Sequence, residues 1–197
     1  MTIIPATTVA RVRLLLVKSG AEDDVLLTSM IAAVTLDIEA FLGYPISKEV
    51  RTEEYTPDLN GHYVFLRVLP VDGITEVRVD TSWVFGSNSI VPADFYRLDR
   101  EVGAVFFTSE LPEGFRTVRV TYLAGIATST TDLINVAPDI AMAADLQVAE
   151  EWRRKNDPGS TGRQGPRGGH SWSGELRMLQ IVKDRLTPRR RLTVGSM

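Results

Sequence analysis

The sequence contains no cysteine and only two histidines, His62 and His170. A chain without cysteine forms no disulfide, no thiolate nucleophile and no thiolate metal site, and this composition suits a reducing compartment. Neither histidine has a convincing set of further ligands at metal-binding spacing, so neither is predicted to bind a metal or to act in acid–base catalysis. The sequence therefore predicts a protein that is not an enzyme and that uses no cofactor.

Long uncharged hydrophobic runs are also missing. The most apolar stretch, from Met30 to Phe41, is interrupted by Asp37 and Glu39, whereas a membrane-spanning helix needs about 20 apolar residues. Residues 1–5 lack the basic start and the apolar run of a signal peptide, so none is expected. A hydrophobic content of 44% in 197 residues is enough for one soluble domain with additions.

Charge is distributed unevenly along the chain. Residues 1–150 contain 11 Lys and Arg against 21 Asp and Glu, a net charge of −10, whereas residues 151–197 contain 11 against 4, a net charge of +7. These two values sum to the overall charge of −3. An acidic body with a basic tail favours attraction between copies of the chain, to an acidic partner or to a polyanion.

Three motifs that resemble reactive sites have simpler structural interpretations. The run Glu22-Asp23-Asp24 suits the N-terminus of a helix, where carboxylates oppose the helix dipole. Glu53 and Glu54 are adjacent in a predicted strand, so their carboxylates point to opposite faces and do not converge. The Gly-rich stretch 162–169 lacks the Lys-Ser/Thr ending of a phosphate-binding loop and is interpreted as a linker.

Helical patterns occupy the two ends of the body. Thr7 or Thr8 caps a helix predicted over 7–18, with Gly20 as its stop signal, and a second helix is predicted over 22–42. A third helix is predicted over 138–155, where Pro138 suits the first turn. Its apolar face repeats every four residues, at Ile140, Ala144, Val148 and Trp152.

The middle of the chain, at about 48–123, is predicted to form a β-region. Short runs rich in Val, Tyr and Phe are separated by turns such as the one at 57–61, a pattern typical of an antiparallel sheet or small sandwich. The fold class predicted is α+β, mainly helical, with an inserted antiparallel β-region. The predicted organisation is a body over 1–156, a flexible Gly/Arg-rich segment over 157–174, and a C-terminal helix with a basic tail over 175–197.

Several motifs, in this order along residues 22–155, resemble those of head–tail connector (adaptor) proteins of long-tailed bacteriophages. They are Asp23-Asp24-Val25-Leu26-Leu27, Met30-Ile31-Ala32-Ala33-Val34, Asp37-Ile38-Glu39-Ala40-Phe41-Leu42-Gly43, Leu69-Pro70-Val71, Ile74-Thr75-Glu76-Val77, Val120-Thr121-Tyr122-Leu123-Ala124-Gly125, Ala137-Pro138-Asp139-Ile140 and Glu150-Glu151-Trp152-Arg153. Each motif is weak alone, and the resemblance rests on their joint order and spacing.

The resemblance implies a structural subunit without a catalytic site. Members of this family form a ring, usually of twelve copies, below the portal vertex. Such a ring extends the DNA channel, through which genomic DNA passes without sequence-specific contact, and offers a platform to the next neck, stopper or tail protein. The implied location is the neck of the virion, after synthesis in the cytoplasm of the bacterial host.

The basic C-terminal region is predicted to bind the portal protein or a neighbouring subunit. Trp172 lies in a Gly/Ser context without a local core, so it suits burial against a partner, whereas Trp152 at a helix end suits core packing better. The predicted partner-binding residues are Trp152, Arg153, Arg154, Arg163, Arg167, Trp172, Arg177, Arg185, Arg189, Arg190 and Arg191.

Two other functions remain open at this stage. The first is a different neck or tail-completion protein, such as a stopper subunit, which the short strands would suit. The second is a nucleic-acid-binding module that uses the arginine-rich tail, although Trp172 is the only aromatic residue close to those arginines.

Overall fold

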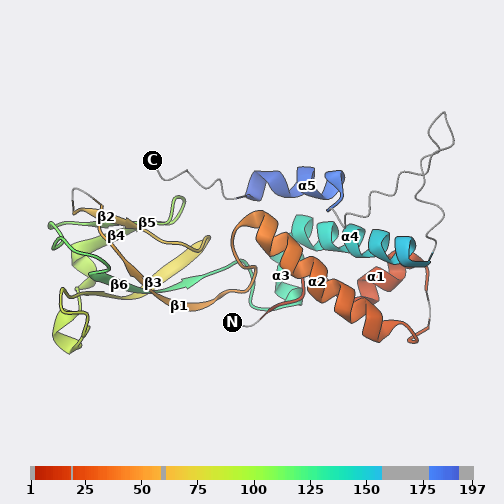
Figure 1. The fold of residues 1–197 in the computed structure, drawn as a ribbon, viewed down its shortest axis with the longest axis horizontal. Helices are drawn as coiled ribbons and strands as arrows, with labels where there is room; N and C mark the ends of the chain where they lie inside the picture. Colours follow the sequence, from red (N-terminus) through yellow and green to blue (C-terminus); the bar gives the residue numbers. More distant parts are fainter. Residues whose placement is uncertain (1–2, 19, 59–60, 157–177, 191–197) are drawn as a thin grey trace. The chain divides into compact units, whose positions relative to one another are not determined.

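The computed structural model describes residues 3–18, 20–58, 61–156 and 178–190. The chain divides into two compact units (Figure 1). Met1–Gly43 and Ser129–Met197 make up one, called the helical unit here, and Tyr44–Thr128 make up the other, called the β-unit. The β-unit is thus inserted between two helical parts of the chain.

Helix α4 is the central helix of the helical unit, because it packs against the other four α-helices (Figure 1). The elements of this unit are α1 (Val9–Leu16), α2 (Asp24–Leu42), α3 (Thr130–Val136), α4 (Pro138–Asn156), α5 (Gln180–Leu186) and the short 3-10 helix η3 (Thr187–Arg189). All four members of the apolar face predicted on the third helix are buried in α4. Burial of such a stripe is the main source of stability for a helix of this length.

Helix α1 begins as predicted and ends earlier. The hydroxyl of Thr8 accepts a hydrogen bond from the backbone N–H of Arg11, which satisfies one of the unpaired donors of the first turn. The predicted end at residue 18, with Gly20 as the stop, is wrong. Val17 adopts a left-handed conformation with φ of 54°. Its N–H donates to the backbone carbonyl of Leu14, which ends the helix.

Helix α2 begins beside the predicted acidic cluster. Lys18 forms an ion pair with Asp23 at 2.5 Å, and Arg13 forms one with Asp24, so these carboxylates tie α2 to α1. By length and hydropathy alone α2 resembles a membrane-spanning helix. One of its faces nevertheless belongs to the core of the helical unit, with Leu27, Ile31, Val34, Ile38 and Leu42 buried.

Helices α3 and α4 are separated by the single residue Ala137. Pro138 begins α4, as predicted from its fixed φ and missing N–H. The sequence did not predict α3, whose N-cap Ser129 accepts a hydrogen bond from the N–H of Asp132 at 3.1 Å.

The β-unit contains two antiparallel three-stranded sheets, with strand orders β1-β6-β3 and β2-β5-β4. Two further 3-10 turns, η1 (Ser87–Ser89) and η2 (Ala93–Phe95), lie between β3 and β4. The strands are β1 (Glu49–Tyr55), β2 (Tyr63–Phe65), β3 (Val71–Val79), β4 (Tyr96–Asp99), β5 (Ala104–Phe107) and β6 (Val118–Ala124).

The carboxylate of Glu53 belongs to a polar cluster on the first sheet. The hydroxyls of Tyr55 and Tyr122 both donate to its carboxylate, the latter at 2.8 Å, and they accept the backbone N–H groups of Arg67 and Val68. Burial raises the pKa of both tyrosines, so their hydroxyls stay protonated and continue to donate.

The neighbouring carboxylate, on Glu54, binds Arg119 at 2.7 Å instead. The two glutamates therefore have separate partners, as expected from their adjacent positions in a strand.

The fold class is α+β, as predicted. The expectation that it is mainly helical is not confirmed, because the five α-helices stand beside a β-unit with two sheets and its own core. That core includes Val64, Leu66, Val105, Val120 and Tyr122.

Candidate interaction surfaces

The C-terminal helix α5 lies antiparallel to α4 (Figure 1). Val182 and Leu186 are fully buried. The N–H of Leu179, the N-cap residue of α5, donates to the side-chain oxygen of Gln147 at 2.9 Å. Burying two aliphatic side chains contributes about 1.5–3 kcal/mol each. This docking attaches α5 to α4 just before the arginines that follow.

Three arginines, Arg185 of α5, Arg189 of η3 and Arg190 directly after it, contact side chains of α2 or α4. Arg189 pairs with Asp139 at 2.5 Å, Arg185 contacts the sulfur of Met142 at 2.8 Å, and the guanidinium of Arg190 lies 5.0 Å from the centre of the Phe41 ring. Their backbone positions are therefore set by contacts with α2 and α4, and Arg190 remains exposed. The structure thus places three of the predicted partner-binding residues on one docked element.

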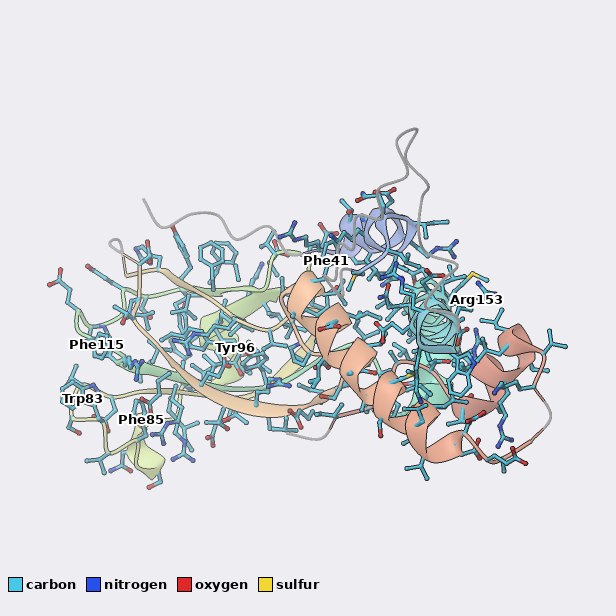
Figure 2. All side chains as sticks on the ribbon, turned by 45° about the vertical axis from the view of Figure 1, so that its right-hand side comes forward. Phe41, Trp83, Phe85, Tyr96, Phe115 and Arg153 are labelled. Atoms are coloured by element: carbon cyan, nitrogen blue, oxygen red, sulfur yellow. The ribbon has the colours of Figure 1, made fainter. Side chains whose placement is uncertain are left out.

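The end of α4 carries three more predicted residues in different surroundings. Trp152 is only 5% exposed, and the amine of Lys18 lies 4.1 Å from its ring centre, so it packs in the core of the helical unit. Arg154 pairs with Glu150 at 3.0 Å. Arg153 is exposed and is the member of this group with its side chain at the surface (Figure 2).

The remaining predicted partner-binding residues, Arg163, Arg167, Trp172, Arg177 and Arg191, lie outside the described residues. The same holds for the whole Gly/Arg-rich segment 157–174. Their predicted roles stay predictions.

A second exposed surface, which the sequence did not indicate, lies on two loops of the β-unit (Figure 2). We call it the β-tip and define it by Trp83, Val84, Phe115 and Arg116. The exposed fractions of Trp83, Val84 and Phe115 are 58%, 76% and 65%. Trp83 and Phe115 lie on loops that are in contact, and Val84 is next to Trp83 in the sequence, so these exposed apolar side chains are grouped. Grouped apolar side chains mark interaction sites more often than scattered ones do.

The two loops of the β-tip are held together by side-chain hydrogen bonds. The indole Nε1 of Trp83 donates to the backbone carbonyl of Phe115 at 2.9 Å. The carboxylate of Asp80 accepts the N–H groups of Ser82 and Phe85, each at 2.8 Å. Arg119 lies with its guanidinium 3.9 Å from the centre of the buried Phe85 ring. These contacts hold the turn at residues 80–85 in place.

Backbone strain is concentrated at the β-tip and at the adjoining residue Phe85. Trp83, Phe85 and Arg116 have φ values of 59°, 50° and 54°, in the left-handed region that favours glycine. Each such residue costs about 1–2 kcal/mol, and the cost is tolerated only where surrounding contacts impose the conformation. Elsewhere among the described non-glycine residues, only Val17 shares this geometry.

A shallow polar pocket of about 310 Å³ adjoins the β-tip. Both of its glutamates already have partners: the tyrosine hydroxyls donate to Glu53, and Arg119 forms an ion pair with Glu54. Across the described ranges, no group of three His, Cys, Asp or Glu side chains could hold a metal ion. The pocket is lined by Thr52, Glu53, Glu54, Arg67, Arg116 and Arg119.

Comparison with known proteins places the fold. No protein-family model and no curated protein matches the sequence. Among solved structures, a chain from the neck of an empty gene transfer agent particle, computed with C6 symmetry, matches with a TM-score of 0.64 and 21% identity. The match covers 99% of this chain and 96% of that one. The chain has the fold of a gene transfer agent neck protein.

Two further matches agree with this fold. One is from the neck of the native particle, computed with C12 symmetry, with a TM-score of 0.60 and 21% identity. The other is from the virion of the native particle, with a TM-score of 0.60 and 20% identity. Both cover 99% of this chain and 96% of the other. The resemblance to phage connectors that was stated from sequence motifs is thus matched at the level of the fold.

Proposed function

We propose that this chain is a structural subunit of the neck of a tailed phage or phage-like particle. In this proposal it forms a homo-oligomeric ring, of twelve copies, beneath the portal. The ring extends the DNA channel and joins the head to the next neck, stopper or tail protein. The observation that carries the proposal is the fold match over nearly the full length of both chains, to neck proteins in structures computed with C6 and C12 symmetry.

The chemistry of the described residues is compatible with a structural role. The polar pocket beside the β-tip has its glutamates bound to tyrosine hydroxyls and to Arg119, and the tyrosine pKa values are raised by burial. No side chain there is set up as a nucleophile with an adjacent base.

The basic C-terminal region is the proposed contact with the portal or with a neighbouring subunit. Docking of α5 on α4 presents Arg185, Arg189 and Arg190 together, and Arg153 is exposed at the end of α4. The other proposed contact residues are Arg163, Arg167, Trp172, Arg177 and Arg191. The acidic body, with a net charge of −10 over residues 1–150, is proposed to let DNA slide past by repelling its phosphates.

Loss of the chain tests the proposed function directly. A phage or particle genome in which this gene carries an early stop codon should yield heads and tails that remain separate, counted by negative-stain electron microscopy. Supplying the intact chain in trans should restore joined particles. Normal numbers of joined particles without the chain would contradict the proposal, and heads that fail to form at all would assign it to an earlier step.

A further inference from the structure

The β-tip has three properties that together point to a binding role. Its apolar side chains are exposed, its loops are fixed by the Trp83 and Asp80 hydrogen bonds, and its backbone is strained at Trp83 and Arg116. A fixed loop loses little conformational entropy when it binds, which favours affinity. Trp, Phe and Arg are also the residue types that most often dominate binding energy at protein interfaces.

The charge at the β-tip indicates the chemistry of the surface that it meets. The guanidinium of Arg116 lies 5.0 Å from the centre of the Phe115 ring, and within the described part of the chain it has no carboxylate partner. A partner that covers the apolar side chains would also remove this cation from water, and a carboxylate on the partner would offset the cost of that burial. The fitting surface is therefore apolar with an acidic residue beside it.

A second copy of this chain offers such a surface. Residues 1–150 contain 21 acidic residues against 11 basic ones, so the body of a neighbouring copy is rich in carboxylates. A cyclic ring is built from a heterologous interface, in which one patch of each subunit meets a different patch of the next. The matching neck structures were computed with C6 and C12 symmetry, which places copies of that chain side by side around an axis.

We infer that the β-tip is one half of the contact between neighbouring copies of this chain, with the aromatic side chains buried against the next subunit and Arg116 paired with a carboxylate of that subunit. This inference rests on the proposed ring. It adds to the proposal a specific surface, and it assigns the strained loops a role in assembly.

The test compares two matched double variants of the purified full-length chain. Phe115→Ala with Arg116→Glu alters the β-tip. Phe65→Ala with Arg97→Glu alters an exposed aromatic residue and an exposed arginine on the other sheet of the same unit. Self-association is measured by sedimentation over a range of concentrations. The β-tip variant should weaken it on the order of tenfold or more, and the control should change it less than about twofold.

A cysteine probe identifies the partner. The chain has no cysteine, so the Ser87→Cys variant carries a single thiol, close in sequence to Trp83 and Val84 of the β-tip. A benzophenone reagent can be attached to that thiol alone. Irradiation should give a covalent dimer of this chain, at a yield that falls with the β-tip double variant. Val84→Asp, at a side chain that is 76% exposed, serves as a second variant, and thermal melting checks that each variant is folded.

Three outcomes would overturn the inference: a wild-type chain that does not self-associate, equal effects of the two double variants, or irradiation that gives no covalent dimer of this chain. None of these bears on whether the chain is needed to join heads to tails. Conversely, self-association through the β-tip in a chain that heads and tails do not require would leave the inference standing and remove the proposed function.

Discussion

At Gly125, which directly follows β6, the fold leaves no room for a side chain. Its φ is +126°, and a Cβ there would lie 2.2 Å from the backbone oxygen of Ser47. Gly125→Ala should therefore lower the free energy of unfolding by at least about 3 kcal/mol, through strain and overpacking together. Gly73→Ala is the control, since a Cβ at Gly73 meets nothing within 4 Å. Urea unfolding of both variants measures the difference, and equal losses would contradict this account.

Glu151 on α4 makes stability depend on pH. Burial raises the pKa of its carboxyl, and the nearby charge of Asp37 adds to that effect. The folded chain thus binds this proton more tightly than the unfolded chain, so ionisation of Glu151 costs stability above its raised pKa. The cost disappears as the pH falls through that value.

Glu151→Gln should therefore raise the melting temperature at about pH 7, and the gain should vanish near pH 4, where the carboxyl is protonated in both states. The hydrogen bond from Gln147, at 3.0 Å, can still be accepted by the new amide oxygen. Glu150→Gln, which weakens the ion pair with Arg154, should give no gain at either pH. A gain of equal size at both pH values would rule out ionisation as the cause.

Sequence patterns predicted individual residues well where the cause was local. The cap at Thr8, the start of α4 at Pro138 and the separate partners of Glu53 and Glu54 each follow from geometry within a few residues. The β-tip could not be predicted in this way. Trp83 and Arg116 have positive φ values, and neither position is occupied by the glycine that usually signals such a turn. The loops that carry them are far apart in the sequence and are joined by the hydrogen bond from Trp83 to Phe115.

At the scale of elements, Asp145 fastens α1 to the central helix. Its carboxylate is buried and accepts two hydrogen bonds from the guanidinium of Arg11, at 3.0 and 2.6 Å, and another from the hydroxyl of Thr7. Because Arg11 is about one-third exposed, the attachment is worth less than a fully buried pair.

Asp145→Ala should lower the free energy of unfolding by about 2–3 kcal/mol, because Thr7 and Arg11 lose their acceptor. Glu150→Ala removes the surface pair with Arg154 and should cost no more than about 0.5 kcal/mol. Chemical denaturation of the two variants measures this contrast. A smaller loss for Asp145→Ala than for Glu150→Ala would mean that α1 is held mainly by apolar contacts.

Periodicity predicted both long helices, and among the α-helices it missed only α3 in the part of the chain that the structure describes. Helix α2, with its repeating apolar face, was expected over 22–42 and spans Asp24–Leu42. Helix α3 was missed because Leu133 is the one buried residue among its seven positions, so the sequence there shows no repeating apolar face. A small sandwich was one of the arrangements expected for the strands, but the strand orders within the two sheets were not predicted, since pairing depends on contacts far apart in the sequence.

At the scale of the whole molecule, the C-terminal arginines can be tested without removing α5. Deleting residues 157–197 would also uncover the part of α4 that buries Val182 and Leu186, so a failure to assemble could reflect unfolding. Arg153→Glu combined with Arg190→Glu reverses two exposed charges and leaves that packing in place.

We expect the double charge reversal to reduce binding of the chain to filled heads on the order of tenfold or more, measured by co-sedimentation, with an unchanged melting temperature. Arg97→Glu with Arg100→Glu reverses two exposed charges of the β-unit and is the control. Undiminished binding of the first variant would show that these two arginines do not contact the portal or a neighbouring subunit.

Electron cryo-microscopy of the particle that carries this chain tests the central claim most directly. The account predicts a symmetric ring of this chain immediately below the portal, around the DNA channel, into which both the helical unit and the β-unit fit as single bodies. Density for the chain at a lower level of the neck would assign it to the stopper or tail-completion proteins. Its absence from the particle would contradict the account.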